Sequence, residues 1–139
     1  DSVTPREIEY AFKLIFEDRT ISIMAYNLET VLAEKFETII TRGVTNTRMR
    51  DFYDVYVLTN TQTFDVNIFK TALNKTAEKR GTTKQMATGV MNTIDFIMEN
   101  EIMADLWQKY QKKYFYAADI SWAMVIDAVR DLSEKAMSS

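Results

Sequence analysis

The sequence predicts a mainly α-helical protein, a bundle of five or six helices preceded by a short antiparallel β-hairpin. Its 139 residues suffice for one domain with a real core, and 47% of them are hydrophobic. Only three glycines and one proline are present, which leaves few hairpin or sandwich turns and favours helices. We therefore expect a single domain over residues 1–139, with the hairpin in 1–26 and the helical region in 27–139.

The hairpin is predicted from alternation near the start of the sequence. Every second position from Tyr10 to Phe16 carries an aromatic or aliphatic side chain, as in a strand with one buried face. The chain can turn at the polar run "EDRT" and form a second strand over "ISIMAY". An isolated hairpin is marginally stable in water, so this one would need a helix or further strands to cover it.

Capping residues place the first two helices. Asn27 is a good N-cap, Glu29 is favourable in the first turn that follows, and Gly43 is a natural residue to end the helix. The first helix is therefore expected between Asn27 and Gly43. Thr47 can cap a second helix, which we expect to run to about residue 60.

The later helices are predicted from the same signals. Asp65 caps a third helix, which stops at Gly81 because glycine readily adopts the left-handed conformation that ends helices. The remaining helices are expected around residues 86–99, around residues 101–115 and from Asp119 or Ser121 onward.

Composition excludes several classes of chemistry. The sequence has no cysteine and no histidine, so it holds no disulfide, no thiolate or imidazole metal site and no histidine general base. A net charge of −3 argues against a protein whose whole surface tracks nucleic acid, although a local basic patch is allowed. No apolar run approaches the roughly 20 residues of a membrane span, so we expect no membrane contact and a cytoplasmic protein.

One cation falls where the first helix should be apolar. On a helical wheel, Lys35 lies between Val31 and Leu28, at the edge of the predicted buried stripe. In the next helix, Asp51 and Asp54 border another apolar stripe. The lysine could reach past its neighbours to solvent, or it could pair with the aspartates and fix the angle between the helices. Alternatively, the three groups could face a polyanionic substrate, with the lysine on phosphate and a carboxylate on a metal or proton.

Arginines cluster around the start of the second helix. Arg48 and Arg50 fall in its first turn, where the helix dipole disfavours cations, and Arg42 ends the preceding helix. A helix N-terminus with free amides and several guanidinium groups suits an anion such as phosphate. A solvated basic corner is the other interpretation, and the sequence pattern does not decide between them.

Two other groups of residues have ordinary structural explanations. The cations between residues 75 and 84, Arg80 among them, lie near a helix C-terminus, and we interpret them as a solvated face. Trp107, Tyr110 and Tyr114 recur at helical spacing among lysines. Such aromatic residues could stack on nucleic-acid bases, but at this spacing we favour core positions for them.

The run "LAEKFETIITRGVTNTRMRDFYDVYVL" resembles the AbiEii family of nucleotidyltransferase-like abortive-infection toxins. The similarity extends upstream through "TPREIEYAFKLIFEDRTISIMAYNLET" and, more loosely, downstream through "TAEKRGT" and "LWQKYQKKYFYAADISW". It covers nearly the whole chain. Its most specific part is the lysine followed by the Arg-Asp-x-x-Asp segment.

The resemblance implies a DNA-polymerase-β-like nucleotidyltransferase, the toxin of a bacterial toxin–antitoxin pair linked to phage defence. Such enzymes bind a nucleoside triphosphate with Mg2+, and some members modify transfer RNA ends. By position, Lys35 matches the family lysine that is expected to contact triphosphate, and Asp51 matches the functional aspartate of the Arg-Asp-x-x-Asp segment. The expected site thus has catalytic residues Lys35 and Asp51, phosphate-binding residues Arg48 and Arg50, and supporting residues Asp54 and Arg42.

The sequence departs from the family pattern in one respect. The family's first motif, Gly-Ser followed by Asp-x-Asp, supplies the metal-binding carboxylates, and neither element occurs in the 139 residues. We therefore expect the C-terminal helical region of a longer protein, with the hairpin as the tail of a catalytic sheet. Mg2+ and the nucleoside triphosphate would bind the full-length protein, while this chain alone would hold no metal and be inactive.

The partners expected from the resemblance are the N-terminal catalytic region, a transfer RNA or other RNA acceptor, and a cognate antitoxin that is a genetic rather than a physical partner. A different function is also compatible with the sequence. The chain could be a non-catalytic RNA- or protein-binding helical module, with a basic loop formed by Arg42, Arg48 and Arg50. In a third interpretation, Lys35 pairs with an aspartate only to lock two helices together.

Overall fold

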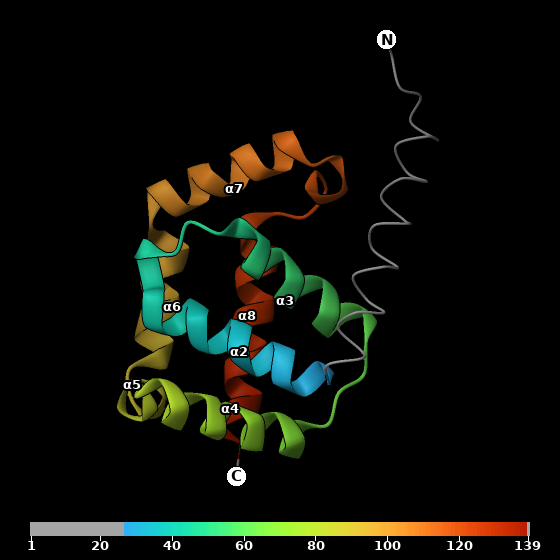
Figure 1. Ribbon diagram of the computed structural model, residues 1–139. Coiled ribbons are helices and arrows are strands. Elements are labelled where there is room, and N and C mark those ends of the chain that lie inside the picture. Colours follow the sequence, from blue (N-terminus) through green and yellow to red (C-terminus); the bar gives the residue numbers. More distant parts are fainter. Residues whose placement is uncertain (1–26, 139) are drawn as a thin grey trace.

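The computed structural model describes residues 27–138, and the predicted hairpin in residues 1–26 lies outside them. Within the described residues the fold is mainly α-helical and contains no strand. The elements are α2 (Leu28–Arg42), the 3-10 helix η1 (Gly43–Thr45), α3 (Met49–Thr61), α4 (Val66–Arg80), α5 (Thr83–Ala87), α6 (Val90–Glu99), α7 (Glu101–Lys113), the 3-10 helix η2 (Phe115–Ala117) and α8 (Trp122–Met137). Figure 1 shows them along the chain.

The described residues form seven α-helices, so the expectation of five or six is wrong. The difference arises where one helix was expected around residues 86–99. Residues 83–87 already form the short helix α5, which ends at the extended residue Thr88. Gly89 then takes a left-handed conformation with φ of 76°, and α6 begins after it. Glycine adopts this conformation without the steric cost that a side chain brings, so the chain changes direction there.

Local capping chemistry explains most helix ends. The side chain of Asn27 accepts a hydrogen bond from the amide of Glu29 at 3.0 Å, as predicted for the start of α2. Asp65 accepts from the amide of Ile68 at 2.9 Å, and Ser121 accepts from Met124 at 3.1 Å. These caps are confirmed, and so are the ends of α2 and α4 before glycines.

The predicted cap of the second helix is wrong by one residue. Helix α3 begins at Met49, and Arg48 rather than Thr47 occupies its N-cap position. The side chain of the buried residue Asn46 accepts a hydrogen bond from the amide of Arg48 at 3.0 Å, and it thus orders the turn before the helix. Arg48 consequently lies at the junction between this turn and α3.

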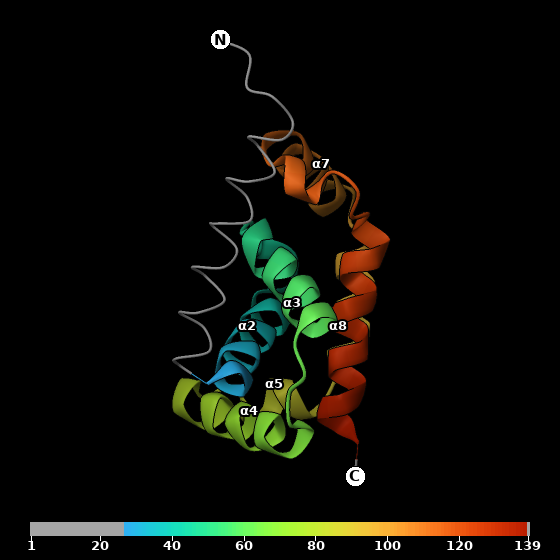
Figure 2. The same ribbon diagram turned by 90° about the vertical axis from the view of Figure 1, so that its right-hand side faces the viewer.

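The core lies between α2, α3 and α8. Helix α2 packs against α4 on one side and α3 on the other, and α3 packs against α8. Figures 1 and 2 show α7 and α4 at opposite ends of the molecule, with α2, α3 and α8 between them. The most deeply buried side chains of the three central helices include Leu32, Phe36, Ile39, Phe52, Val55, Val125 and Ile126. Their burial fixes α2 relative to its neighbours, and α2 carries most of the candidate site.

The aromatic residues of α7 belong to this packing. Trp107 is 1% exposed, its ring stacks on Tyr110 at 5.2 Å between centroids, and its indole N–H donates to the carbonyl of Ile120 at 2.8 Å. The preference for core positions is confirmed for Trp107, while Tyr110 and Tyr114 are half-buried around it. None of the helices in residues 27–138 combines the length and the apolar character that crossing a bilayer requires.

Candidate phosphate-binding site

Lys35 of α2 is held between two carboxylates of α3. Its Nζ atom lies 3.3 Å from Oδ1 of Asp51 and 3.0 Å from Oδ2 of Asp54. The two aspartates are one helical turn apart on α3, so both can face the same point on α2. The Lys35 side chain is 22% exposed and the aspartate side chains 6% and 5%. The lysine therefore forms an ion-pair cluster that joins two helices, in place of reaching past its neighbours to solvent.

This cluster contains one ammonium group and two buried carboxylates. Buried charges are costly unless they are paired, so the ammonium group of Lys35 stabilises the two buried carboxylates. The ion pair alone contributes little net stability, because the desolvation of its members offsets most of the attraction.

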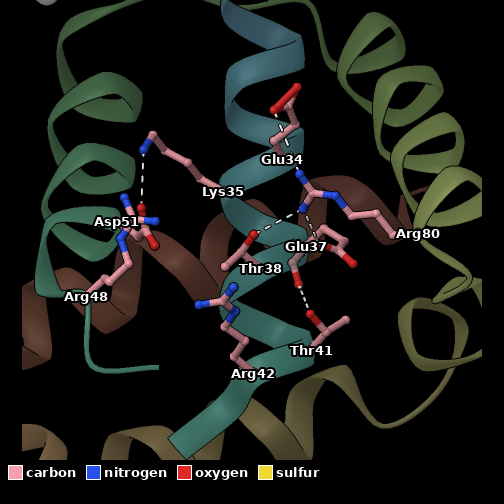
Figure 3. Close-up of a pocket in the computed structure, with 9 residues that line it drawn as sticks. All are labelled: Glu34, Lys35, Glu37, Thr38, Thr41, Arg42, Arg48, Asp51 and Arg80. Carbon is pink, nitrogen blue, oxygen red and sulfur yellow. Dashed lines mark hydrogen bonds and ion pairs between the residues drawn. The ribbon is translucent and has the colours of Figure 1, made fainter. Parts of the chain in front are cut away.

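An open pocket of about 440 Å3 adjoins the cluster. Figure 3 shows α2 running between α3 and α4, with side chains from all three helices turned toward the space. Six lining residues come from α2, two from the start of α3 and one from the end of α4. The lining residues are Glu34, Lys35, Glu37, Thr38, Thr41, Arg42, Arg48, Asp51 and Arg80.

Four cations line this pocket, and they differ in their partners. Lys35 and Arg80 form ion pairs. Arg42 and Arg48, by contrast, form no ion pair with any residue between 27 and 138. Both of these side chains belong to exposed residues, Arg42 at the last position of α2 and Arg48 at the N-cap of α3. Guanidinium groups match the geometry of phosphate oxygens, so two arginines without an ionic partner among the described residues suit an anion.

The wall opposite Lys35 is built around Glu37, which the sequence reasoning missed. Glu37 is 2% exposed, and its Oε1 accepts from Nη1 of Arg80 at 2.5 Å. Its Oε2 accepts from the hydroxyl of Thr82 at 2.8 Å. Arg80 is exposed, as expected for the solvated face, but its guanidinium also reaches back to α2 and pairs with Glu37, which the sequence does not predict (Figure 3).

A sequence signal for Glu37 does exist. Ala33 and Ile40 precede and follow it by one helical turn, and both are buried. Residues at these spacings share a face of the helix, so the buried arc of α2 is wider than the stripe drawn around Leu28. No comparable signal identifies Arg80 as the partner, because 43 residues separate the two in the chain.

The structure brings together some of the predicted site residues and not others. Lys35, Asp51, Arg42 and Arg48 line the same pocket. Asp54 contacts Lys35 but is not among the lining residues. Arg50 is exposed on α3 and does not line the pocket either.

The described residues offer few ligands for a metal ion. Among residues 27–138, no group of three or more aspartate or glutamate side chains is arranged to hold a metal. Asp51 and Asp54 each contact the ammonium group of Lys35, which competes with a cation for their oxygens. Mg2+ requires a near-octahedral set of oxygen ligands. The described residues by themselves therefore do not fit a magnesium site.

Comparison with known proteins identifies a family whose model matches the sequence. A family model described as "Nucleotidyl transferase AbiEii toxin, Type IV TA system" matches residues 1–132 of the chain. This match includes every residue that lines the pocket. Neither the curated proteins nor the solved structures give a match.

Proposed function

Because the chain belongs to the AbiEii family of nucleotidyl transferase toxins of type IV toxin–antitoxin systems, we propose that its pocket binds the triphosphate of a nucleotide in Mg2+-dependent nucleotidyl transfer. The observation that supports the proposal most directly is the convergence of Lys35, Asp51, Arg42 and Arg48 on one pocket. These residues come from α2, α3 and the turn between them, and the sequence pattern predicts each of them as a site residue.

Each residue has a role that follows from its position. Arg42 and Arg48 would donate hydrogen bonds to phosphate oxygens, since their guanidinium groups have no other ionic partner among the described residues. Lys35 would neutralise charge on the transferred phosphoryl group, with Asp51 and Asp54 holding its ammonium group at the pocket edge. A fixed cation is more effective in such a site than one that must reorganise during the reaction.

The proposal includes parts outside the described residues. The carboxylates for Mg2+ would come from a region of a longer protein that carries the Gly-Ser and Asp-x-Asp elements, which the 139 residues lack. This chain alone would then not complete nucleotidyl transfer. Membership of the family implies a cognate antitoxin. We extend the proposal to an RNA acceptor such as transfer RNA, to a role in phage defence and to action in the cytoplasm.

A binding experiment separates this proposal from the basic-loop alternative. The 139-residue chain is titrated with inorganic tripolyphosphate, and the variants Arg42→Gln, Arg48→Gln and Arg50→Gln are compared with Lys79→Gln, an exposed lysine that does not line the pocket. The pocket predicts a loss of about tenfold in affinity at Arg42 and Arg48, because each would lose a charge-assisted hydrogen bond. It predicts a smaller loss at Arg50. Equal losses at all three arginines would favour the basic loop.

Activity is tested in the full-length toxin. Asp51→Asn should abolish growth inhibition and nucleotidyl transfer while the purified variant keeps its helical circular dichroism. The matched control is Asp105→Asn, because Asp105 is an exposed aspartate on α7 that lies outside the pocket. Full toxicity of a folded Asp51→Asn variant would contradict the assignment of this residue to the site.

A further inference from the structure

Arg80 has a guanidinium group that is only partly used. Its Nη1 atom donates to Oε1 of Glu37 at 2.5 Å and to the hydroxyl of Thr38 at 3.1 Å. Its Nη2 atom lies 3.9 Å from Oε2 of Glu34, which is too long for a hydrogen bond. A guanidinium group carries five N–H donors, and no described residue accepts a hydrogen bond from Nη2 or Nε. The side chain is 40% exposed and lines the pocket, so these donors are accessible to a ligand.

Glu37 holds this guanidinium group in place. Both of its carboxylate oxygens are occupied, one by Arg80 and the other by Thr82. The two partners flank Gly81, which ends α4 in the left-handed conformation with φ of 71°. This turn lets residues on both sides of the glycine reach the same carboxylate. The Glu37 carboxylate is buried and accepts two hydrogen bonds, so it would lose both partners if it moved. The hydrogen bond from Arg80 to this carboxylate therefore orients the guanidinium group.

We propose that Arg80 is a phosphate-binding residue of the pocket and that Glu37, together with Thr82, positions its guanidinium group. The inference rests on the proposed function. It adds a second side of the pocket that would contact the same ligand, which is the phosphate chain of a nucleoside triphosphate. Arg48 would contact this chain from the α3 side and Arg80 from the α4 side, across the face of α2 (Figure 3). An arginine side chain can bind a carboxylate with one edge of its guanidinium group and a phosphate with the other. Lysine has no planar group of this kind and cannot do both in a fixed geometry.

A purely structural role for Arg80 makes a different prediction. If the Glu37–Arg80 pair only joined α4 to α2, removing the arginine would lower the stability of the protein and leave its affinity for phosphate unchanged once the protein is folded. The affinity of the folded protein for a phosphate chain is therefore the decisive readout.

The first experiment titrates the 139-residue chain with tripolyphosphate by calorimetry at low salt. Arg80→Gln is compared with Lys79→Gln, which removes the same charge from the neighbouring position of α4, and circular dichroism verifies that each variant is folded. We expect Arg80→Gln to weaken binding about tenfold and Lys79→Gln less than twofold. Equal affinities for the two folded variants would overturn the inference. Arg80→Lys should recover only part of the loss, because lysine restores the charge but not the fork.

The same titration includes Arg48→Gln, so that two kinds of failure can be distinguished. If Arg48→Gln weakens binding and Arg80→Gln does not, the inference about Arg80 fails while the phosphate pocket stands. If the unaltered chain does not bind tripolyphosphate, or if neither Arg48→Gln nor Arg80→Gln weakens binding, the proposed function fails and the inference fails with it.

The positioning role of Glu37 has a test in which charge and geometry act in opposite directions. Glu37→Gln removes a negative charge beside the ligand, which by Coulomb attraction alone would strengthen anion binding. If Glu37 positions Arg80, the variant should instead bind tripolyphosphate about fivefold more weakly. Stronger binding would overturn the positioning role. Should Glu37→Gln fail to fold, Thr82→Val changes no charge and removes one bond to Glu37, so weaker binding supports the role and unchanged binding overturns it.

Discussion

Replacing Lys35 should reveal how strongly the two aspartates depend on its ammonium group. Lys35→Met keeps the length of the side chain and removes its charge, which takes the ammonium group away from Asp51 and Asp54, each of them 4% exposed. Breaking a buried pair by removing one partner costs roughly 3–5 kcal/mol. We expect the lower end, about 3 kcal/mol, because the lysine side chain is 22% exposed and water can partly solvate the aspartates after its removal.

Because one lysine contacts two aspartates, variants of the aspartates can be compared with Lys35→Met. Asp51→Asn leaves Lys35 paired with Asp54, so the cost should be only about 1 kcal/mol, that of the one hydrogen bond that Lys35 loses. The triple variant Lys35→Met, Asp51→Asn, Asp54→Asn carries no charge. It should recover at least half of the loss caused by Lys35→Met, because no uncompensated buried charge remains.

Urea denaturation followed by circular dichroism measures these free energies of unfolding. For a domain of this size, a loss of about 3 kcal/mol corresponds to a decrease of roughly 10 °C in melting temperature. Lys79→Met serves as the control, because Lys79 is exposed and forms no ion pair among the described residues, and it should cost less than about 0.5 kcal/mol. If Lys35→Met cost no more than this control, the aspartates would not depend on the lysine, and the account of the cluster would be refuted.

Three further predictions follow from the same geometry. Asp65→Ala should lower the free energy of unfolding by about 1 kcal/mol, because it removes the cap on the amide of Ile68, and thermal denaturation against Asn67→Ala, an exposed residue of the same helix, would show it. Gly81→Ala should cost about 1 kcal/mol because its φ is 71°, and it should also weaken tripolyphosphate binding if the turn shapes the Arg80 wall. Tripolyphosphate affinity should decrease as sodium chloride is raised, since the contributing arginines are exposed, and an affinity independent of salt would contradict the role given to them.

The parts of this fold that were predictable from the sequence are those decided by neighbouring residues. Asn27, Asp65 and Ser121 cap their helices because the cap and its amide partner lie within three positions of each other. The helical wheel correctly drew attention to Lys35, since a cation at the edge of an apolar stripe requires an explanation wherever the helix packs. The pairing of that lysine with the next helix could be suggested but not decided, because the angle between two helices is set by packing across the whole interface.

Other parts depended on contacts that no local pattern contains. The wall formed by Glu37 and Arg80 joins α2 to the end of α4, and the sequence around Arg80 resembles an ordinary solvated helix terminus. The break at Gly89 was missed because a single glycine within an otherwise helical stretch is compatible with a continuous helix. In both cases tertiary structure selects one of several local possibilities.

The charge balance of the pocket indicates how it would recognise phosphate. Its lining holds four cations, Lys35, Arg42, Arg48 and Arg80, against three carboxylates, and Asp54 adds a fourth carboxylate behind Lys35. The formal charges of these eight described residues balance, so they supply no large net positive field to drive binding. Affinity would then come from directed donors, two of them oriented by carboxylates and two of them without an ionic partner among the described residues. Adding a positive charge on the nearby surface should therefore strengthen binding far less than removing one lining arginine weakens it. A basic surface that attracts polyanions by net charge would show comparable effects in both directions.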